Sequence, residues 1–465
     1  MEIDIKYPRI IQGGMGINIS NYHLASSVSM LGQQGTISGV TLERVLIRIL
    51  QNGDLDGDIR RALSFFPFPK ISEKILQKYF IEGGIKKLTP FKGVPFFSIN
   101  PPASLIELVI AANFCMVWLA KEEHNNPVSI NYLEKVSMPH IYAITGAMLA
   151  GVDFITMGAG IPIKIPPVIE AISKWETASY PIPVDDKDRK RFNHIMSFDP
   201  KSFLGEKPFE IKKPGFIPII SSNILAQKLL KELPVGDVYG FVVEEYFAGG
   251  HNAPPRNKID YGEKDFVNYE KLAEMGLPFW IGGKYASPEK LEWALSIGAK
   301  GIQAGSIFAL CEDSGMDIMI RRSLRRLGYN QELNVKTDFR VSPTDYPFKV
   351  AQLPETLSEE NVYNSRERVC SQGGLIVLYE KENGSIGYRC PSEPIDKYLS
   401  KGGKIEETVG RGCLCNGLLS TAGLGDFGEP PIVTMGDETI FLKRLMLNER
   451  DWYGAREAID YLLSF

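Results

Sequence analysis

The stretch Phe241–Arg256, FVVEEYFAGGHNAPPR, organises the rest of this 465-residue chain. It begins with Phe241-Val242-Val243, the apolar and β-branched pattern of a buried strand. The strand opens into Gly249-Gly250-His251, and parallel α/β proteins usually keep their chemistry at such strand ends. Glycines let a ligand approach the backbone, and a histidine exchanges a proton near neutral pH. The stretch therefore predicts a functional site, although a tight turn with a surface histidine is the alternative interpretation.

The composition is that of an ordinary globular protein. The chain is 44% hydrophobic and 23% charged, with a formal net charge of −4. This balance indicates neither nucleic acid nor an anionic membrane as a partner. No apolar run approaches the roughly 18 residues of a membrane span, and the first residues lack the pattern of a signal peptide. We therefore expect a cytoplasmic protein without a membrane span.

Six cysteines are spread over the chain, and four of them fall within residues 370–415. That segment holds a Cys-x-Cys at Cys413 and Cys415 but no Cys-x-x-Cys pair, so the spacing is a weak signal for zinc or iron–sulfur ligation. In a cytoplasmic protein the cysteines are expected to be free thiols. The sequence predicts no metal site.

Short apolar strands alternate with helices along roughly the first 320 residues, which implies a parallel sheet. Eight strands are expected, and a further extended segment at 94–99 raises the count to nine if it belongs. This count favours an α/β fold of the eight-stranded parallel β/α (TIM) barrel type over an open doubly wound sheet. Ser287 is a typical N-cap residue, and Pro288 would occupy the first position of the helix that follows. That helix is expected to end at Gly298. The predicted strands are 8–12, 35–39, 128–132, 152–157, 216–220, 238–243, 278–281 and 301–304.

Two segments interrupt or follow this alternation. Residues 174–214 are polar, carry prolines and have no clear period, so we expect an inserted, lid-like excursion within a barrel of residues 1–330. Residues 331–465 lack regular alternation and are interpreted as a C-terminal extension that packs on the barrel. The extension is expected to end in a helix over 451–463 and to offer a contact for a homodimer.

The predicted strands end in glycine or polar clusters, and in a barrel these ends meet at one rim. The loops after the last two strands of a barrel are a common phosphate site, because free backbone N–H groups there point at the ligand. No Gly-x-Gly-x-x-Gly fingerprint follows the first strand, which favours FMN over FAD or NAD. FMN would also supply redox chemistry that the side chains lack. The clusters are Gln12-Gly13-Gly14, Asn131, Gly158, Ser222-Asn223, Gly249-Gly250-His251, Gly282-Gly283 and Gly305-Ser306.

These clusters belong to stretches through which the chain resembles the nitronate monooxygenases, formerly called 2-nitropropane dioxygenases, which are FMN-dependent β/α barrels. The stretches occur in the family's order, and the resemblance is strongest to a longer branch with a C-terminal extension. Residues 342–349 and 410–418 (GRGCLCNGL) are similar to that extension. In the barrel the matching stretches are 10–16 (IIQGGMG), 128–133 with its Asn131, 151–162 (GVDFITMGAGIP), 248–251 (AGGH) and 298–306 (GAKGIQAGS).

The resemblance implies that Gly14, Met15 and Asn131 lie against the flavin ring and that Gln303, Gly305 and Ser306 help to hold the ribityl phosphate. It also implies that His251 is the active-site histidine, where it can hydrogen-bond or protonate the substrate's oxygens. The candidate catalytic residue is therefore His251. The full set of candidate cofactor-binding residues is Gly13, Gly14, Met15, Asn131, Ser222, Gly250, Gly282, Gly283, Lys284, Gln303, Gly305 and Ser306.

Three departures from the family pattern bear on the site. Gly14 stands where most of the family has proline, although the longer branch is similar to this chain there. Lys284 replaces the second glycine after the seventh strand, where it could neutralise phosphate charge or crowd the backbone. Residues 245–247, Glu-Tyr-Phe, replace smaller residues and are expected to bring bulk and charge near the site.

The predicted function is an FMN-dependent oxidoreductase that oxidises an alkyl nitronate, or a similar small anion, with oxygen. One alternative is an FMN-dependent enoyl-acyl-carrier-protein reductase that uses NAD(P)H, and another is a flavin-binding protein with little turnover. The remaining histidines, His23, His124, His140 and His194, have no motif around them and are expected to be structural.

Overall fold

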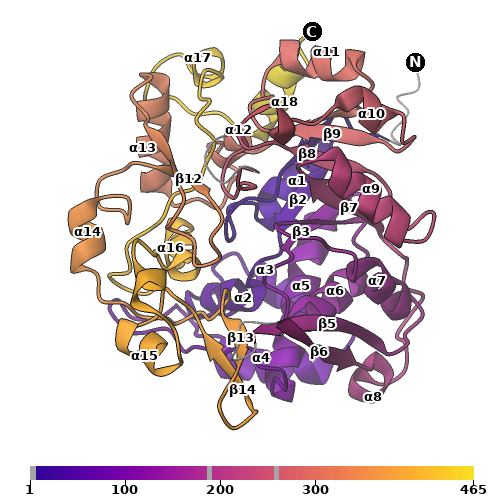
Figure 1. Cartoon of the computed structure of the whole chain (residues 1–465), viewed down its shortest axis with the longest axis vertical. Coiled ribbons are helices and arrows are strands. Elements are labelled where there is room, and N and C mark those ends of the chain that lie inside the picture. Colours follow the sequence, from indigo (N-terminus) through magenta and orange to yellow (C-terminus); the bar gives the residue numbers. More distant parts are fainter. Residues whose placement is uncertain (1–6, 186–190, 256–260) are drawn as a thin grey trace.

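A computed structural model describes residues 7–185, 191–255 and 261–465 of the chain (Figure 1). Eight parallel strands form one sheet in the order β1-β10-β9-β8-β7-β4-β3-β2. The two outer strands meet, because Gln12 N–H donates to the Gln34 carbonyl at 2.9 Å and Gln34 N–H donates to the Ile10 carbonyl at 3.1 Å. The sheet is thus closed into the predicted TIM barrel. Its strands are β1 (Ile10–Gln12), β2 (Gly35–Ser38), β3 (Val128–Leu133), β4 (Phe154–Gly158), β7 (Gly215–Ile220), β8 (Phe241–Glu244), β9 (Phe279–Gly282) and β10 (Gly301–Ala304).

Helices cover the outside of this barrel between consecutive strands (Figure 1). The segment 94–99 is not a strand in the structure, so the barrel has eight strands and not nine. Ser287 caps its helix as predicted, accepting from Lys290 N–H at 3.3 Å. The barrel helices are α1 (Tyr22–Met30), α2 (Leu42–Gln51), α3 (Asp58–Phe65), α4 (Pro69–Tyr79), α5 (Ala103–Lys121), α6 (His140–Leu149), α7 (Ile165–Ser173), α9 (Asn223–Glu232), α10 (Tyr269–Ala273), α11 (Pro288–Ser296) and α12 (Ser306–Ala309).

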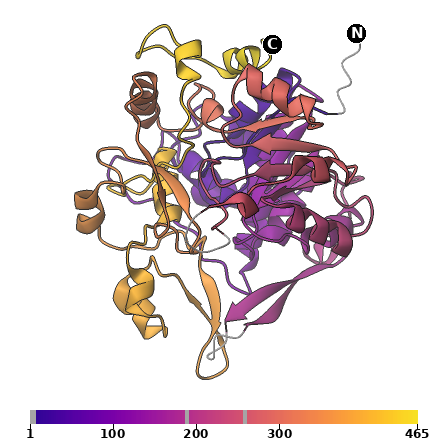
Figure 2. The ribbon, with the colours of Figure 1, turned by 45° about the horizontal axis from the view of Figure 1, so that its top comes forward.

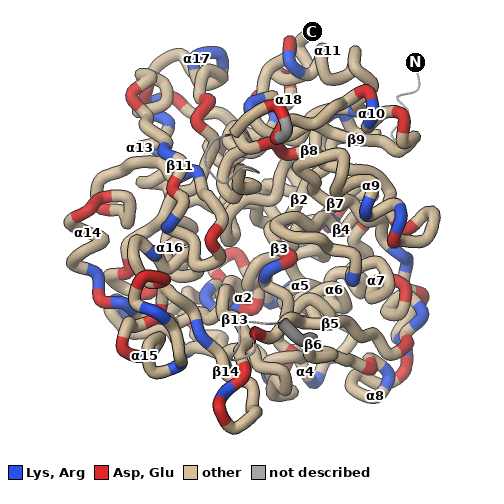
Figure 3. Tube along the Cα trace, in the orientation of Figure 1, with Lys and Arg blue, Asp and Glu red and all other residues tan. Residues whose placement is uncertain are grey.

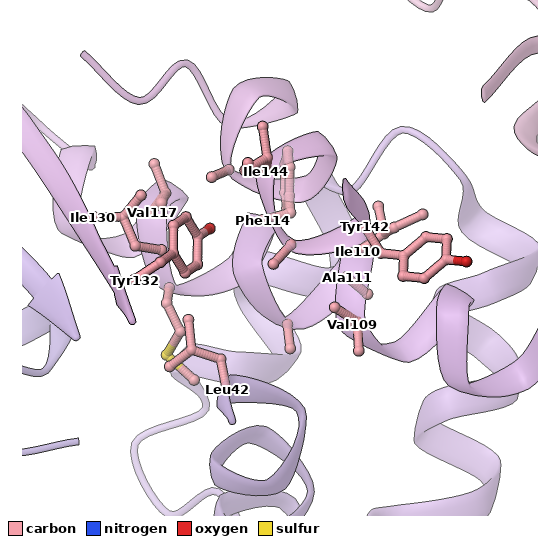
Figure 4. Close-up of a cluster of buried hydrophobic side chains, with 14 of the residues drawn as sticks. Leu42, Val109, Ile110, Ala111, Phe114, Val117, Ile130, Tyr132, Tyr142 and Ile144 are labelled. Carbon is pink, nitrogen blue, oxygen red and sulfur yellow. The ribbon is translucent and has the colours of Figure 1, made fainter. Parts of the chain in front are cut away.

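Helix α5 is the most apolar element and forms the centre of the larger hydrophobic core. Figure 4 shows Phe114 of α5 beside Ile144 of α6, and Val117 of α5 beside Ile130 of β3. By length and composition alone, α5 is the one helix in the described part of the chain that could cross a membrane. No apolar run of this length was expected from the sequence. Most of the helix is buried within the fold, where it packs against α1, α2, α3, α4 and α6.

The segment 174–214 is more regular than its sequence suggested. It forms a hairpin of β5 (Ala178–Asp185) and β6 (Arg191–Phe198), followed by α8 (Pro200–Leu204). Strand β5 also pairs in parallel with β13 (Val377–Glu380), and β13 pairs with β14 (Ile386–Arg389) of the C-terminal extension. This four-stranded sheet joins the insertion to the extension at the foot of the molecule as seen in Figure 2.

The C-terminal extension lies against one side of the barrel, where it is drawn in orange to yellow in Figure 1. Its Val433, Met435 and Phe441 share a hydrophobic core with Ala304 and Phe308 of the barrel. The last helix begins and ends within the predicted range 451–463. The remaining elements are α13 (Ile318–Tyr329), β11 (Val335–Asp338), β12 (Phe348–Ala351), α14 (Glu360–Ser365), α15 (Ile395–Ser400), α16 (Leu414–Thr421), α17 (Leu442–Leu445) and α18 (Ala455–Leu462).

Charged residues of both signs are interspersed over the outer elements, while the barrel strands are nearly free of them (Figure 3). Glu244, the last residue of β8, is the only Asp, Glu, Lys or Arg in the eight barrel strands, all of which are described. A carboxyl group in this otherwise uncharged barrel is a feature that strand packing does not require.

His140 is a buried structural histidine whose shifted pKa makes the stability of the protein depend on pH. Its Nε2 lies 2.9 Å from the Leu133 carbonyl, and its Nδ1 is buried without a partner among the described residues. Burial, and then the nearby Lys164, lower the pKa of His140 to about 3. In the unfolded chain its pKa is near the ordinary 6.5, so below that pH only the unfolded state takes up the proton. The stabilising contribution is therefore complete above pH 6.5 and is lost as pH falls towards 3.

Because only the unfolded state takes up this proton, His140 should lower the free energy of unfolding by about 2 kcal/mol as pH falls from 6.5 to 5. Replacing His140 with Gln should flatten that part of the profile. Urea unfolding midpoints at the two pH values measure the difference. Equal pH dependence in wild type and His140→Gln would show that the histidine is not held neutral by the fold.

Candidate functional site

A cavity of about 230 Å³ opens at the carboxyl ends of the barrel strands, between the barrel and the C-terminal extension. Its barrel wall is mostly backbone of glycine-bearing loops, and its other wall comes from the extension. The lining includes Gly13–Ile17, Asn131, Lys135, Glu244, Ala248–His251, Gly283–Ala286, Gln303–Ser306, Ser342, Thr344, Phe348, Gly374, Leu414, Cys415, Thr434–Gly436 and Glu438.

The loop that carries His251 is held in place by the start of the extension. Lys349 N–H donates to the Gly250 carbonyl at 2.9 Å, and Asn252 N–H donates to the Pro347 carbonyl at 2.9 Å. The His251 ring stacks on Tyr346 at 4.7 Å between centroids and meets Phe348 edge-on at 5.2 Å. The extension therefore fixes both the path of this loop and the orientation of the imidazole.

His251 lines the cavity and has one ring nitrogen without a hydrogen-bond partner among the described residues. Its Nε2 is buried and has no hydrogen-bond partner among the described residues. Burial, and then the positive charge of Lys135, lower the pKa of His251 to about 4. The imidazole is therefore neutral at physiological pH, with one nitrogen able to donate a hydrogen bond and the other to accept one. A buried polar atom without a partner is costly, and a ligand in the cavity would supply the missing contact.

Lys135 supplies positive charge to the same side of the cavity. Its Nζ lies 3.7 Å from the centroid of the Tyr346 ring, the ring on whose face His251 also stacks. The tyrosine ring thus contacts both the cation and the imidazole. This combination of an ammonium group and a neutral histidine suits a small anionic ligand.

Glu244 lies at the base of the cavity. Gln303 Nε2 donates to its Oε1 at 2.5 Å, and burial raises the pKa of Glu244 to about 7, although the hydrogen bond from Gln303 acts in the opposite direction. The next strand approaches closely, because a Cβ on Gly282 would lie 3.1 Å from Cγ of Glu244. The cavity therefore contains a carboxyl group that changes its charge near neutral pH.

The loops after the last two strands form the end of the cavity predicted to bind phosphate. Gly436 of the extension donates its N–H to Ser306 Oγ at 3.0 Å, so this end is closed by the segment Thr434–Glu438. Lys284 Nζ pairs with Asp437 at 2.9 Å, and Lys349 Nζ lies 3.3 Å from the same carboxylate. Lys290 Nζ pairs with Glu438 of the same segment at 2.8 Å, so three lysines with two carboxylates leave a net charge of about +1, which favours a phosphate.

The cavity walls are built to let a flat ligand lie close to the backbone. A Cβ on Gly14 would come within 2.5 Å of the Asn131 side chain, and a Cβ on Gly249 would come within 2.5 Å of the Gly436 nitrogen. A Cβ on Gly305 would meet only Met15, at 3.5 Å. Glycine at position 14 is thus required by its neighbour Asn131. The backbone walls, the positive end and the unpartnered His251 nitrogen are together compatible with FMN.

The structure brings most of the predicted site residues together. Two candidates do not line the cavity: Ser222 caps α9 by accepting from Leu225 N–H at 3.2 Å, and Gly282 lies below the cavity floor beside Glu244. Ser222 thus lies outside the cavity lining, and its hydroxyl accepts a bond within its own helix. The candidates that line the cavity are Gly13, Gly14, Met15, Asn131, Gly250, His251, Gly283, Lys284, Gln303, Gly305 and Ser306.

The departure at residues 245–247 does not bring bulk or charge into the cavity. Glu245 is buried and accepts from Val267 N–H at 2.8 Å, while Tyr246 stacks on Tyr261 at 4.0 Å. None of the three residues is part of the lining, which begins at Ala248. Sequence reasoning instead missed Lys135, Glu244 and the residues of the extension. Of these, Glu244 carried a signal, since it is a carboxylate at the end of an apolar strand.

No family model and no curated protein matches the chain. Among solved structures it is similar to FabK from Thermotoga maritima, at 13% identity and a TM-score of 0.45 over 99% of this chain and 94% of that one. It is also similar to nitroalkane oxidase from Streptomyces ansochromogenes, at 11% identity and a TM-score of 0.45 over 98% and 95% of the two chains. At these values the fold assignment rests on the strand order and closure described above.

Proposed function

We propose that the protein is an FMN-dependent oxidoreductase that oxidises an alkyl nitronate or a similar small anion with oxygen. The observation that carries the proposal is the buried, unpartnered Nε2 of His251, a residue that lines a backbone-walled cavity with Lys284 and Lys349 gathered around Asp437 at the loops after the last strands. The sequence resemblance to nitronate monooxygenases supports the same interpretation. When bound, FMN supplies the electron acceptor for the substrate and the electron donor for oxygen.

The protein's own side chains have the tasks of binding and orienting the substrate. Lys135 attracts the anion, and the neutral imidazole of His251 donates to or accepts from an oxygen of the substrate. The stack on Tyr346 and the edge contact with Phe348 keep the ring from turning away. The extension segment Thr434–Glu438 covers the end of the cavity beside Ser306.

Identification of the cofactor is the first test. The purified protein, as isolated or after incubation with FMN and FAD together, is expected to release FMN on denaturation, as identified by mass spectrometry. FAD as the sole flavin, or no flavin after this reconstitution, would contradict the proposal. The expectation rests on the short phosphate end, which the segment Thr434–Glu438 closes against Ser306.

The charge at the phosphate end predicts opposite effects for two substitutions. Lys284→Ala removes one of two positive charges around Asp437 and should weaken FMN binding by about 1–2 kcal/mol, or roughly 5- to 30-fold. Asp437→Asn removes the compensating negative charge and should tighten binding. Fluorescence titration of flavin-free protein measures both. If both variants bind FMN like wild type, the lysine cluster does not face the phosphate.

Glu244 predicts how substrate-driven flavin reduction depends on pH. As pH rises through about 7, the carboxyl group ionises and places a negative charge in a cavity that must admit an anion. The second-order rate constant for flavin reduction should therefore fall above pH 7, by up to about tenfold per pH unit. Glu244→Gln keeps an amide of the same shape and should remove this fall. Stopped-flow reduction from pH 6 to 9 compares the two proteins, and an identical fall in both would assign it to another group.

A further inference from the structure

The lining of the main cavity includes a group of mainly apolar side chains that neither the cofactor site nor the chemistry has used. They come from both sides of the cavity: from the barrel loops after β2 and β3, and from the extension, in α16 and the loop before β13. We call this group the apolar end. It consists of Val40, Thr41, Val136, Leu375, Leu414 and Leu418.

The apolar end begins beside His251. Phe348 meets the His251 ring edge-on at 5.2 Å between centroids, and Phe348 shares a cluster of buried side chains with Leu414. Leu375 and Leu418 pack against the same cluster. These contacts lead from the imidazole directly to the extension side of the apolar end.

The phosphate end lies in another part of the core. Its apolar lining residues Met435 and Phe441 belong to the cluster that contains Ala304. Among the residues that the structure describes, this cluster includes no member of the apolar end. The residues expected to contact FMN do not include one either. The apolar end is therefore available to the substrate.

The wall of the apolar end leaves apolar surface facing the cavity. Val40, Leu375 and Leu418 are only half-buried, although all three line the cavity. Two small voids lie behind this wall, each of about 10 Å³ and each with room for about one water. One void touches Val40 and Val136, and the other touches Leu375 and Leu414. The wall is thus apolar and loosely packed, and an apolar ligand group would remove its surface from water.

We propose that the apolar end binds a straight alkyl chain carried by the substrate anion, and that this chain has several methylene groups. Val136 directly follows Lys135, so the charge that attracts the anion lies next to the barrel side of the apolar end. The head group is held by Lys135 and His251, and the chain extends past Phe348 towards Leu414. This assignment rests on the proposed function for its anionic head group, and on the cavity lining for its chain.

Binding of straight-chain carboxylates tests the chain site without requiring turnover. These small anions are titrated into the FMN-reconstituted protein in a calorimeter, as butanoate, hexanoate and octanoate. Each added methylene group is expected to tighten binding by up to about fourfold, so octanoate should bind roughly 100-fold more tightly than butanoate. Equal affinity for the three, or no binding of any of them, would overturn the proposal.

A substitution in the wall locates the site. Leu418→Gln introduces an amide of similar length and should weaken octanoate binding by roughly tenfold, while butanoate binding stays unchanged. Leu399→Gln is the matched control, because Leu399 is exposed on α15 and lies outside the cavity lining. It should bind both carboxylates like wild type. Equally tight octanoate binding in wild type and folded Leu418→Gln would overturn the assignment to this end, and the wild-type series alone decides the question if Leu418→Gln does not fold.

Nitronates of matching chain length separate a failure of this inference from a failure of the proposed function. The nitronates of nitroethane, 1-nitrobutane and 1-nitrooctane are compared in anaerobic flavin reduction. If octanoate binds more tightly than butanoate but no nitronate reduces the flavin, the proposed function fails and the chain site is supported. If all three nitronates reduce the flavin with the same second-order rate constant and the carboxylates bind equally, the chain site fails and the proposed function is supported.

Discussion

Replacing His251 with Asn is expected to lower the rate of substrate-driven flavin reduction by about 10²–10⁴-fold, the range that a proton-transferring or hydrogen-bonding group contributes. Asn keeps a polar group but cannot place a nitrogen where the buried Nε2 of His251 lies. The side chains at the phosphate end, Lys284, Ser306 and Asp437, bond to one another or to the Gly436 backbone and not to the His251 ring, so FMN should stay bound. Stopped-flow reduction of the flavin-loaded variant by a nitronate, without oxygen, measures the change.

His23→Asn is the matched control, because His23 is exposed on α1 and lies outside the cavity lining. It should reduce its flavin at the wild-type rate. A merely structural role for His251 predicts the reverse pattern, with a lower melting temperature and an unchanged rate per flavin-loaded molecule. Wild-type rates in folded, FMN-loaded His251→Asn would remove this residue from the chemistry.

Gly249→Ala is expected to have the second large effect, this time on cofactor binding. The added Cβ would lie 2.5 Å from the backbone nitrogen of Gly436, and backbone cannot move aside as a flexible side chain can. The segment Thr434–Glu438 must therefore shift and lose its bond to Ser306 Oγ. Such overpacking costs about 1–3 kcal/mol, or roughly 5- to 150-fold in FMN affinity if it falls on the bound state.

Gly93→Ala provides the control, because a Cβ there would meet nothing within 4 Å. It should bind FMN like wild type and melt at the same temperature. Fluorescence titration and thermal unfolding with and without FMN compare the two variants. Unchanged affinity in Gly249→Ala would mean that the extension does not close the phosphate end of the site.

The barrel could be predicted from the sequence because its signals are local. Each strand is an apolar run that is followed by a glycine or polar cluster. The start of α11 is marked by Ser287, whose hydroxyl accepts from Lys290 N–H, and by Pro288, whose ring fixes a helical φ. The hairpin of β5 and β6 was missed because Pro181 and Pro183 argue against a strand. Strand β13 pairs only with Val184 and Asp185 of β5, so no ladder bond on that side requires an N–H from either proline.

The remaining part of the site depends on contacts that no local pattern records. Lys284 of the barrel and Lys349 of the extension, about 65 residues apart in sequence, meet around Asp437 only in the folded protein. Tyr346 and Phe348 reach His251 from almost a hundred residues away in sequence. Ser222 carried the right residue type at a strand end, but its hydroxyl caps α9. Strand ends therefore predict the rim of a barrel more reliably than they predict which side chains face its cavity.

Anaerobic titration of the FMN-reconstituted protein tests the central claim most directly. The flavin absorbance is followed during addition of an alkyl nitronate and, in a parallel sample, of NADH. The account predicts bleaching by the nitronate, none by NADH, and recovery of the oxidised spectrum when oxygen is admitted. Bleaching by NADH and not by the nitronate would contradict it in favour of a nicotinamide-dependent reductase, and bleaching by neither would leave a flavin-binding protein without this activity.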